Sequence, residues 1–118
     1  MAQHNELGKE GEALALEYLR KSDFEILHCN WRYSHYEVDI IGRKNGVLHI
    51  FEVKSRKYFP GAFPEESVSK KKFGFLKKAA EEYLYRHPEY KHVRFNILAI
   101  TLFKNKEPEY FLIEDVFL

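Results

Sequence analysis

The sequence predicts an α/β fold in which one helix, three strands, a second helix and two further strands follow one another (αβββαββ). Three observations support this order. Two segments carry apolar residues at helical spacing, five short runs carry them at strand spacing, and an Asn45-Gly46 dipeptide separates two of those runs. The length of 118 residues is close to the usual size of one domain, so residues 1–118 are expected to form a single domain.

The first half of the chain is predicted to be a helix followed by a meander of strands. The helix is expected over residues 7–21, where Leu16 and Leu19 lie on one apolar stripe. Three strands are expected over residues 24–33, 37–44 and 47–56. Both faces of the second and third strands are apolar, which is typical of a sheet that is covered on both sides.

The second half begins with residues 58–64, where two prolines and a glycine predict a loop. A second helix is expected over residues 68–87, and Pro88 marks its end. Two closing strands are expected over residues 94–103 and 110–113.

The composition narrows the setting in which the protein works. A single Cys29 cannot form an internal disulfide, and the N-terminus lacks the pattern of a signal peptide, so a reducing, cytoplasmic location is expected. No apolar run approaches the ~20 residues that span a bilayer, so no membrane partner is expected. The net charge is only +1, but Lys54 to Lys78 contain eight basic and two acidic residues, a local charge of +6.

A pair of acidic residues on neighbouring strands is the most informative feature of the sequence. A two-residue Asn45-Gly46 turn pairs Lys44 with Val47, and the same register places Asp39 opposite Glu52 on one face. Like charges about 5 Å apart in this position are unfavourable unless a cation binds between them. A divalent metal is the simplest candidate.

Other charged side chains point toward the same place. Glu12 falls on the inward stripe of the first helix, and Lys72 falls on the inward stripe of the second. With Glu12 as a third oxygen donor beside Asp39 and Glu52, the site would suit Mg²⁺, with Mn²⁺ as a substitute. Lys54 lies two residues after Glu52, where it could orient a water or neutralise a phosphate.

Structural explanations for the same residues remain open. Lys54 could neutralise the two carboxylates in an ion-pair network in which Glu37 balances the charge. Glu12 could be a carboxylate near a helix end, stabilised by the macrodipole. Lys72 could extend past the core to water.

Short motifs are spread along nearly the whole chain. They are Gly8, Gly11 and Glu12 in the first helix, Asn30-Trp31-Arg32, Glu37-Val38-Asp39-Ile40-Ile41, Phe51-Glu52-Val53-Lys54, Lys72 ahead of Ala80, and Arg94-Phe95. In these motifs the chain resembles the YraN family of small, poorly characterised bacterial proteins. It departs from that family at Tyr36 and Asn96, where glycine and aspartate are usual.

The YraN family is in turn similar to the PD-(D/E)xK nucleases, which include archaeal Holliday-junction resolvases. The resemblance implies a restriction-endonuclease-like fold, a three-layer α/β/α arrangement with a central mixed sheet. It implies catalytic roles for Glu12, Asp39, Glu52 and Lys54, with Mg²⁺ bound by the two strand carboxylates. Enzymes of this kind cut DNA or RNA by in-line attack of water.

We therefore expect a Mg²⁺-dependent endonuclease that hydrolyses phosphodiester bonds of DNA, on branched or single-stranded forms, with RNA less favoured. Candidate contacts to the nucleic-acid backbone are Arg32, Arg56, Lys71 and Lys72. A homodimer is an open expectation, because paired cuts across a duplex or junction need two sites related by symmetry.

Two other functions remain open at this point. One is a nucleic-acid-binding or adaptor module that keeps the nuclease fold without catalysis, and the other is a protein-interaction domain. Tyr58, Phe59 and Phe63 in the predicted loop could stack on unpaired bases, or could instead close over the protein's own core.

Overall fold

The computed structural model describes residues 2–61 and 70–114, and within them it has two helices and five strands. In chain order these are α1 (Ala2–Lys21), β1 (Glu25–Tyr33), β2 (Tyr36–Lys44), β3 (Val47–Lys57), α2 (Lys70–Arg86), β4 (Val93–Leu102) and β5 (Glu109–Ile113). A helix or strand lies wherever the sequence predicted one, and the mixed α/β class is confirmed. The largest difference is at α1, which begins five residues earlier than expected; the predicted helix start at residue 68 and loop end at residue 64 lie outside the described residues.

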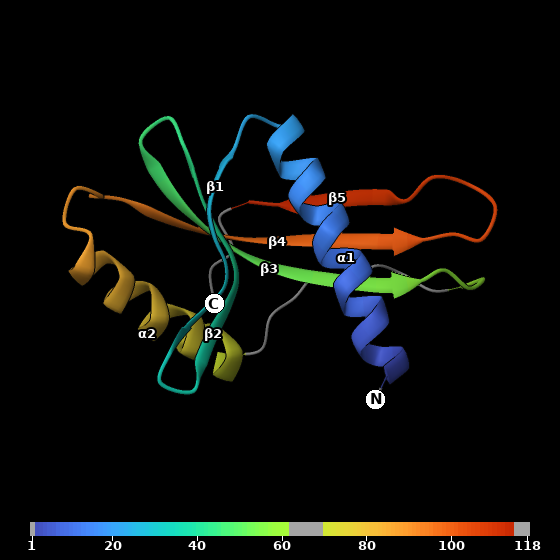
Figure 1. Ribbon diagram of the computed structural model, residues 1–118, viewed down its shortest axis with the longest axis horizontal. Helices are drawn as coiled ribbons and strands as arrows, with labels where there is room; N and C mark the ends of the chain where they lie inside the picture. Colours follow the sequence, from blue (N-terminus) through green and yellow to red (C-terminus); the bar gives the residue numbers. More distant parts are fainter. Residues whose placement is uncertain (1, 62–69, 115–118) are drawn as a thin grey trace.

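The five strands form one mixed sheet in the order β1-β2-β3-β4-β5 (Figure 1). Neighbouring strands are antiparallel except for β3 and β4, which are parallel and are connected through α2. Asn45 and Gly46 have φ angles of 53° and 77°, as a two-residue type I′ hairpin requires. The register predicted from this turn is confirmed from Lys44–Val47 to Ile40–Phe51.

The two helices cover opposite faces of the sheet. Successive strand residues point to opposite faces. Accordingly Ile40 and Phe51 share a core with Ala15 and Leu19 of α1. The residues next to them on β2 and β3 that point to the other face form a second core with α2. In Figure 1, α1 crosses in front of β3 and β4, whereas α2 lies beside the β1–β2 end of the sheet. Neither helix of the described chain is long and apolar enough to cross a bilayer.

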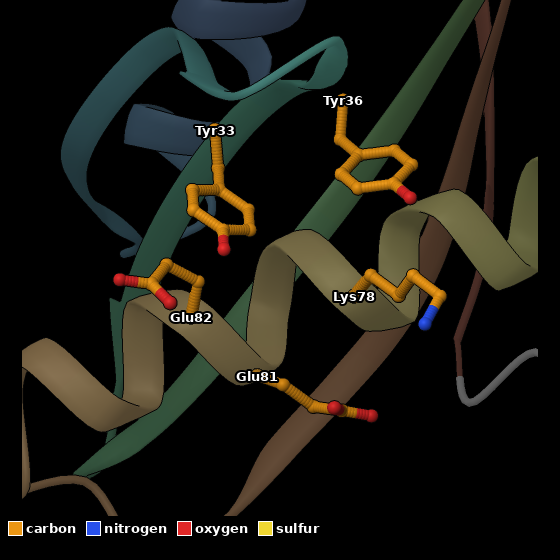
Figure 2. A pocket seen from close by; sticks show the side chains of 5 residues that line it. All are labelled: Tyr33, Tyr36, Lys78, Glu81 and Glu82. Atoms are coloured by element: carbon orange, nitrogen blue, oxygen red, sulfur yellow. The ribbon is translucent and has the colours of Figure 1, made fainter.

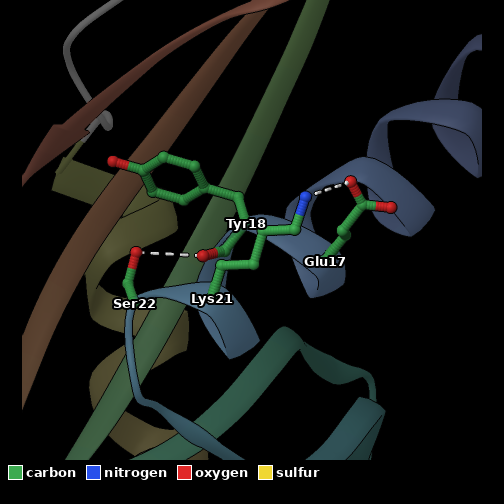
Figure 3. Close-up of polar contacts among 4 residues, drawn as sticks. All are labelled: Glu17, Tyr18, Lys21 and Ser22. Atoms are coloured by element: carbon green, nitrogen blue, oxygen red, sulfur yellow. Dashed lines mark hydrogen bonds and ion pairs between the residues drawn. The ribbon is translucent and has the colours of Figure 1, made fainter.

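The end of α1 is closed by a Schellman motif, in which the backbone turns sharply and satisfies the last carbonyls. The Phe24 N–H donates to the Leu19 carbonyl at 3.0 Å, and the Asp23 N–H donates to the Arg20 carbonyl at 3.1 Å. Asp23 takes the left-handed conformation with φ of 69°. Figure 3 shows two further contacts of this turn, the Ser22 hydroxyl on the Tyr18 carbonyl at 2.9 Å and the Lys21–Glu17 ion pair at 3.1 Å. The cap directs the chain into β1.

The close approach of α1 to β3 depends on Gly11. A Cβ atom added at Gly11 would lie 1.7 Å from the Ser55 hydroxyl oxygen and 2.7 Å from the Ser55 Cβ. The same addition at Gly8, one turn earlier, would meet nothing within 4 Å. This contact explains why a glycine sits inside a helix, where it is otherwise unfavourable.

We expect Gly11→Ala to lower the free energy of unfolding, because overpacking of about 1–3 kcal/mol outweighs a gain in helix propensity of about 1 kcal/mol. Gly8→Ala is the matched control and should raise the free energy of unfolding slightly, since its methyl group enters open space. Urea unfolding of the three proteins checks this. Equal gains in both variants would show that the helix does not approach β3 this closely.

Candidate metal centre

Strands β2 and β3 stop pairing next to Asp39. Their ladder ends at Ile40–Phe51. One residue further, the side chain of Asp39 reaches across and its Oδ2 accepts the Val53 N–H at 2.8 Å. A carboxyl group therefore contacts the backbone where the strands begin to separate. The side chain is fixed by the sheet itself rather than by a loop.

The carboxyl groups of Asp39 and Glu52 lie close enough to affect each other's ionisation, in line with the proximity predicted from the sequence. Glu52 is only 8% exposed. Burial, the hydrogen bond to Glu52 and the charge of Glu52 raise the pKa of Asp39 from 3.8 to about 8, despite the opposing effects of the Val53 N–H and Lys72. Near neutral pH the folded protein therefore favours the protonated form of Asp39.

A lysine from α2 completes this cluster. The Nζ of Lys72 lies 3.2 Å from Oε2 of Glu52, with the lysine side chain 45% exposed and the glutamate side chain 10% exposed. The ion pair confirms that Lys72 lies on the sheet side of the helix. It also gives the carboxyl pair a cationic partner from α2.

Lys54 leaves β3 on the same face as Glu52, because the two residues are two positions apart on one strand. Both residues therefore face the side of the sheet that α2 covers. The arrangement is an acidic pair with basic side chains beside it, which can bind a cation through the carboxylates and an anion next to it.

Glu12 lies in a different contact. Its Oε1 accepts a hydrogen bond from the Asn30 side-chain amide of β1, and Glu12 is not among the groups that shift the pKa of Asp39. Within residues 2–61 and 70–114, no three His, Cys, Asp or Glu side chains form a group that could hold a metal ion. The structure thus brings Asp39 and Glu52 together and places Glu12 with Asn30.

The structure argues against the alternative explanation that the helix macrodipole stabilises Glu12. Because α1 begins at Ala2, Glu12 is more than two turns inside the helix, where the effect of the helix dipole has faded. Asn30 was not predicted as its partner. Asn30 has a φ of 53° within β1, a conformation that asparagine tolerates better than most residues, but one such residue in a sequence carries no signal of this contact.

The predicted nucleic-acid contacts have different surroundings. Arg32 is ion-paired with Glu37 at 2.7 Å, so Glu37 has a basic partner on β1. The Nζ of Lys71 lies 5.9 Å from the centre of the Phe75 ring. Arg56 stands out, because its Nε is buried and has no hydrogen-bond partner in the described structure. A buried N–H without a partner is unfavourable in a folded protein.

The aromatic residues of the predicted loop do not form one stacking surface. Tyr58 packs against Phe103 of the protein itself, with ring centres 4.8 Å apart. Phe59 is 62% exposed. Phe63 lies outside the described residues.

The stability of the protein should fall as the pH rises from about 4 to about 8. In this window the folded protein holds a proton on Asp39 that the unfolded chain, with its ordinary pKa of 3.8, has released. The stabilisation that this proton provides is complete below pH 3.8 and lost above pH about 8. Between these values the free energy of unfolding changes by at most about 1.4 kcal/mol per pH unit. Asp39→Asn should flatten this slope and raise stability at pH 8, because the amide can donate to Glu52 and accept from Val53 without titrating.

The measurement is the free energy of urea unfolding at a series of pH values. Glu17→Gln, on the outer face of α1, is the control and should keep the wild-type slope, which includes the effect of the histidines. A slope that is the same in Asp39→Asn and the wild type would contradict the raised pKa of Asp39.

Comparison with known proteins gives the family. Residues 11–100 match the model of uncharacterised protein family UPF0102. A UPF0102 protein of Flavobacterium johnsoniae is 43% identical over 118 residues, 97% of this chain and 93% of the relative. Proteins of the same name from Christiangramia forsetii and Persephonella marina are 45% and 44% identical, covering 90% and 80% of this chain and 87% and 82% of the relatives. The chain therefore belongs to the UPF0102 family, the YraN-like group that its motifs resemble.

Proposed function

We propose that this protein is a metal-dependent endonuclease that hydrolyses phosphodiester bonds, with DNA favoured over RNA as its substrate. The observation that carries the proposal is the Asp39–Glu52 pair, two carboxyl groups that interact on adjacent strands, with Asp39 held by the Val53 N–H. Holding two acidic groups together inside a protein is unfavourable, and a bound cation would lower that cost.

The chemistry of the donor set fits Mg²⁺. This ion binds proteins through one or two carboxylates and keeps several waters for contact with phosphate oxygens. Asp39 and Glu52 would hold it, once Asp39 has given up its proton. When bound, the ion supplies charge for the phosphate oxygens on which negative charge develops during hydrolysis.

The chain's own residues supply binding and orientation. Lys72 holds the Glu52 carboxylate at 3.2 Å and, being nearly half exposed, can also contact a phosphate. Lys54 projects from the same face of β3 and can orient the attacking water or neutralise the phosphate that is cut. Arg56 is placed two residues further along this face, with an Nε that lacks a partner in the described structure.

The proposal includes a restriction-endonuclease-like fold. It is supported by a mixed sheet with one helix on each face and by an acidic pair where β2 and β3 separate. In this proposal Glu52-Val53-Lys54 is the (D/E)xK part of the signature of the PD-(D/E)xK nucleases. Glu12 would then act on the position of β1 through Asn30 rather than as a metal ligand.

We expect the wild-type protein with Mn²⁺ or Mg²⁺ to cleave at least one member of a panel of linear duplex, single strand, flap, four-way junction and RNA. Asp39→Asn and Lys54→Ala should each reduce the cleavage rate at least about 100-fold while retaining most nucleic-acid binding, because they remove a metal ligand and a charge that acts in the transition state. Cleavage on gels and binding by fluorescence anisotropy provide the two measurements.

Two controls make the result specific. Lys21→Ala removes an exposed lysine of α1 on the opposite side of the sheet and should cleave like the wild type. Calorimetric titration with Mn²⁺ should show binding to the wild type and weak binding to Asp39→Asn. Absence of cleavage with nucleic-acid binding intact in every variant would reject the enzyme and favour a non-catalytic binding module.

A further inference from the structure

A second site lies on the same side of the sheet, between the β1–β2 hairpin and α2. It is a pocket of about 320 Å³ lined by Tyr33, Tyr36, Lys78, Glu81 and Glu82. Figure 2 shows both tyrosine rings pointing toward α2, with Glu82 on the side of Tyr33 and Lys78 on the side of Tyr36. Its volume is at the lower end for small-molecule sites and suits one planar ring system.

The two tyrosines come together because the hairpin between them is tight. Tyr33 pairs with Tyr36 across the two-residue Ser34-His35 turn, and their ring centres are 6.3 Å apart. Tyr36 also packs on Phe75 at 5.2 Å, so its ring is supported by α2. The aromatic walls are therefore held in place without a ligand.

Tyr33 is held by a separate charged contact. The guanidinium of Arg86 lies 5.8 Å from the centre of the Tyr33 ring and is ion-paired with Glu82 at 2.7 Å. This arrangement fixes both the ring and the carboxylate at one end of the pocket.

The charges around the pocket favour a neutral ligand. Lys78 and Arg86 balance Glu81 and Glu82, so there is no excess negative charge among these described residues to select an ammonium ion. Aromatic walls with hydroxyl, carboxylate and ammonium groups at the rim match a nucleobase, which offers a π face for stacking and polar edges for hydrogen bonds. The balance of aromatic area and charge therefore fits a neutral base.

The position of the pocket relative to the carboxyl pair is fixed by α2. Lys72, which contacts Glu52, and Lys78 and Glu82, which line the pocket, lie on this one helix. At 1.5 Å per residue they are separated by about 9–15 Å along its axis. That span corresponds to roughly three to four stacked nucleotides.

We propose that this pocket binds an unpaired base of a nucleic-acid strand whose backbone passes the Asp39–Glu52 pair a few nucleotides away. The proposal rests on the nucleic-acid substrate of the proposed function, and it makes that substrate one with a single-stranded segment. The base stacks on the tyrosines, and Lys78 contacts the adjoining phosphate.

The test is binding of a short single-stranded DNA and of a blunt duplex in buffer with EDTA, so that cleavage plays no part. Stacking of one base predicts that Tyr33→Ala weakens single-strand binding about tenfold with little change for the duplex. Tyr33→Phe keeps the ring and should bind like the wild type. Tyr85→Ala is the matched control, because Tyr85 is a tyrosine of α2 that is 83% exposed and does not line the pocket.

A single strand carrying 2-aminopurine adds a readout of stacking itself. Its fluorescence should be quenched by the wild type and Tyr33→Phe and not by Tyr33→Ala, whose folding is checked by thermal unfolding. Equal single-strand binding by Tyr33→Ala and the wild type would overturn the pocket assignment, as would an equal loss for the duplex. The two proposals can fail independently. Single-strand binding that depends on Tyr33 would support the pocket assignment even if the protein cleaved no substrate.

Discussion

The hydrogen bond from the Val53 N–H to the Asp39 carboxyl group is the interaction on which the candidate centre depends. It ties a side chain of β2 to the backbone of β3 at the point where their ladder has ended. Asp39 then cannot turn away from Glu52, although their mutual repulsion and burial are unfavourable. The ammonium group of Lys72 offsets part of that repulsion, and the raised pKa of Asp39 favours its neutral form. The acidic pair is thus built into the sheet and does not rely on a mobile loop.

Much of the fold could be predicted because its signals are local. Helical and strand periodicity located every element to within a few residues, apart from the early start of α1. The Asn45-Gly46 turn then carried the register over to Ile40–Phe51, since a two-residue hairpin leaves no freedom in pairing. That register is also why the contact between Asp39 and Glu52 could be predicted from the sequence alone. The raised pKa of Asp39 could not, because it depends first on how deeply the carboxyl group is buried.

The remaining features depend on which elements meet in space. Periodicity shows that Glu12 is on the inner side of α1, but not that it meets Asn30 of β1. The tyrosine pocket requires the Tyr33–Tyr36 pairing and the position of α2 together. A register shift between Ile26 and His28 makes the β1–β2 pairing harder to derive from the sequence. Neither the Glu12–Asn30 contact nor the tyrosine pocket can be recognised from the sequence of a single helix or strand.

Under the proposed function, the fixed spacing that α2 sets between Lys72 and the pocket would have a consequence for selectivity. A helix keeps the distance from Lys72 to the pocket nearly constant, while a single strand can adjust to span it. A base inside a duplex is stacked and paired, so it would have to be extruded to enter the pocket, at a cost of a few kcal/mol. An unpaired base requires far less. Discrimination between nucleic-acid forms would then arise from the energy of exposing a base rather than from recognition of its identity, which is consistent with a pocket that has two aromatic walls and balanced charges at its rim.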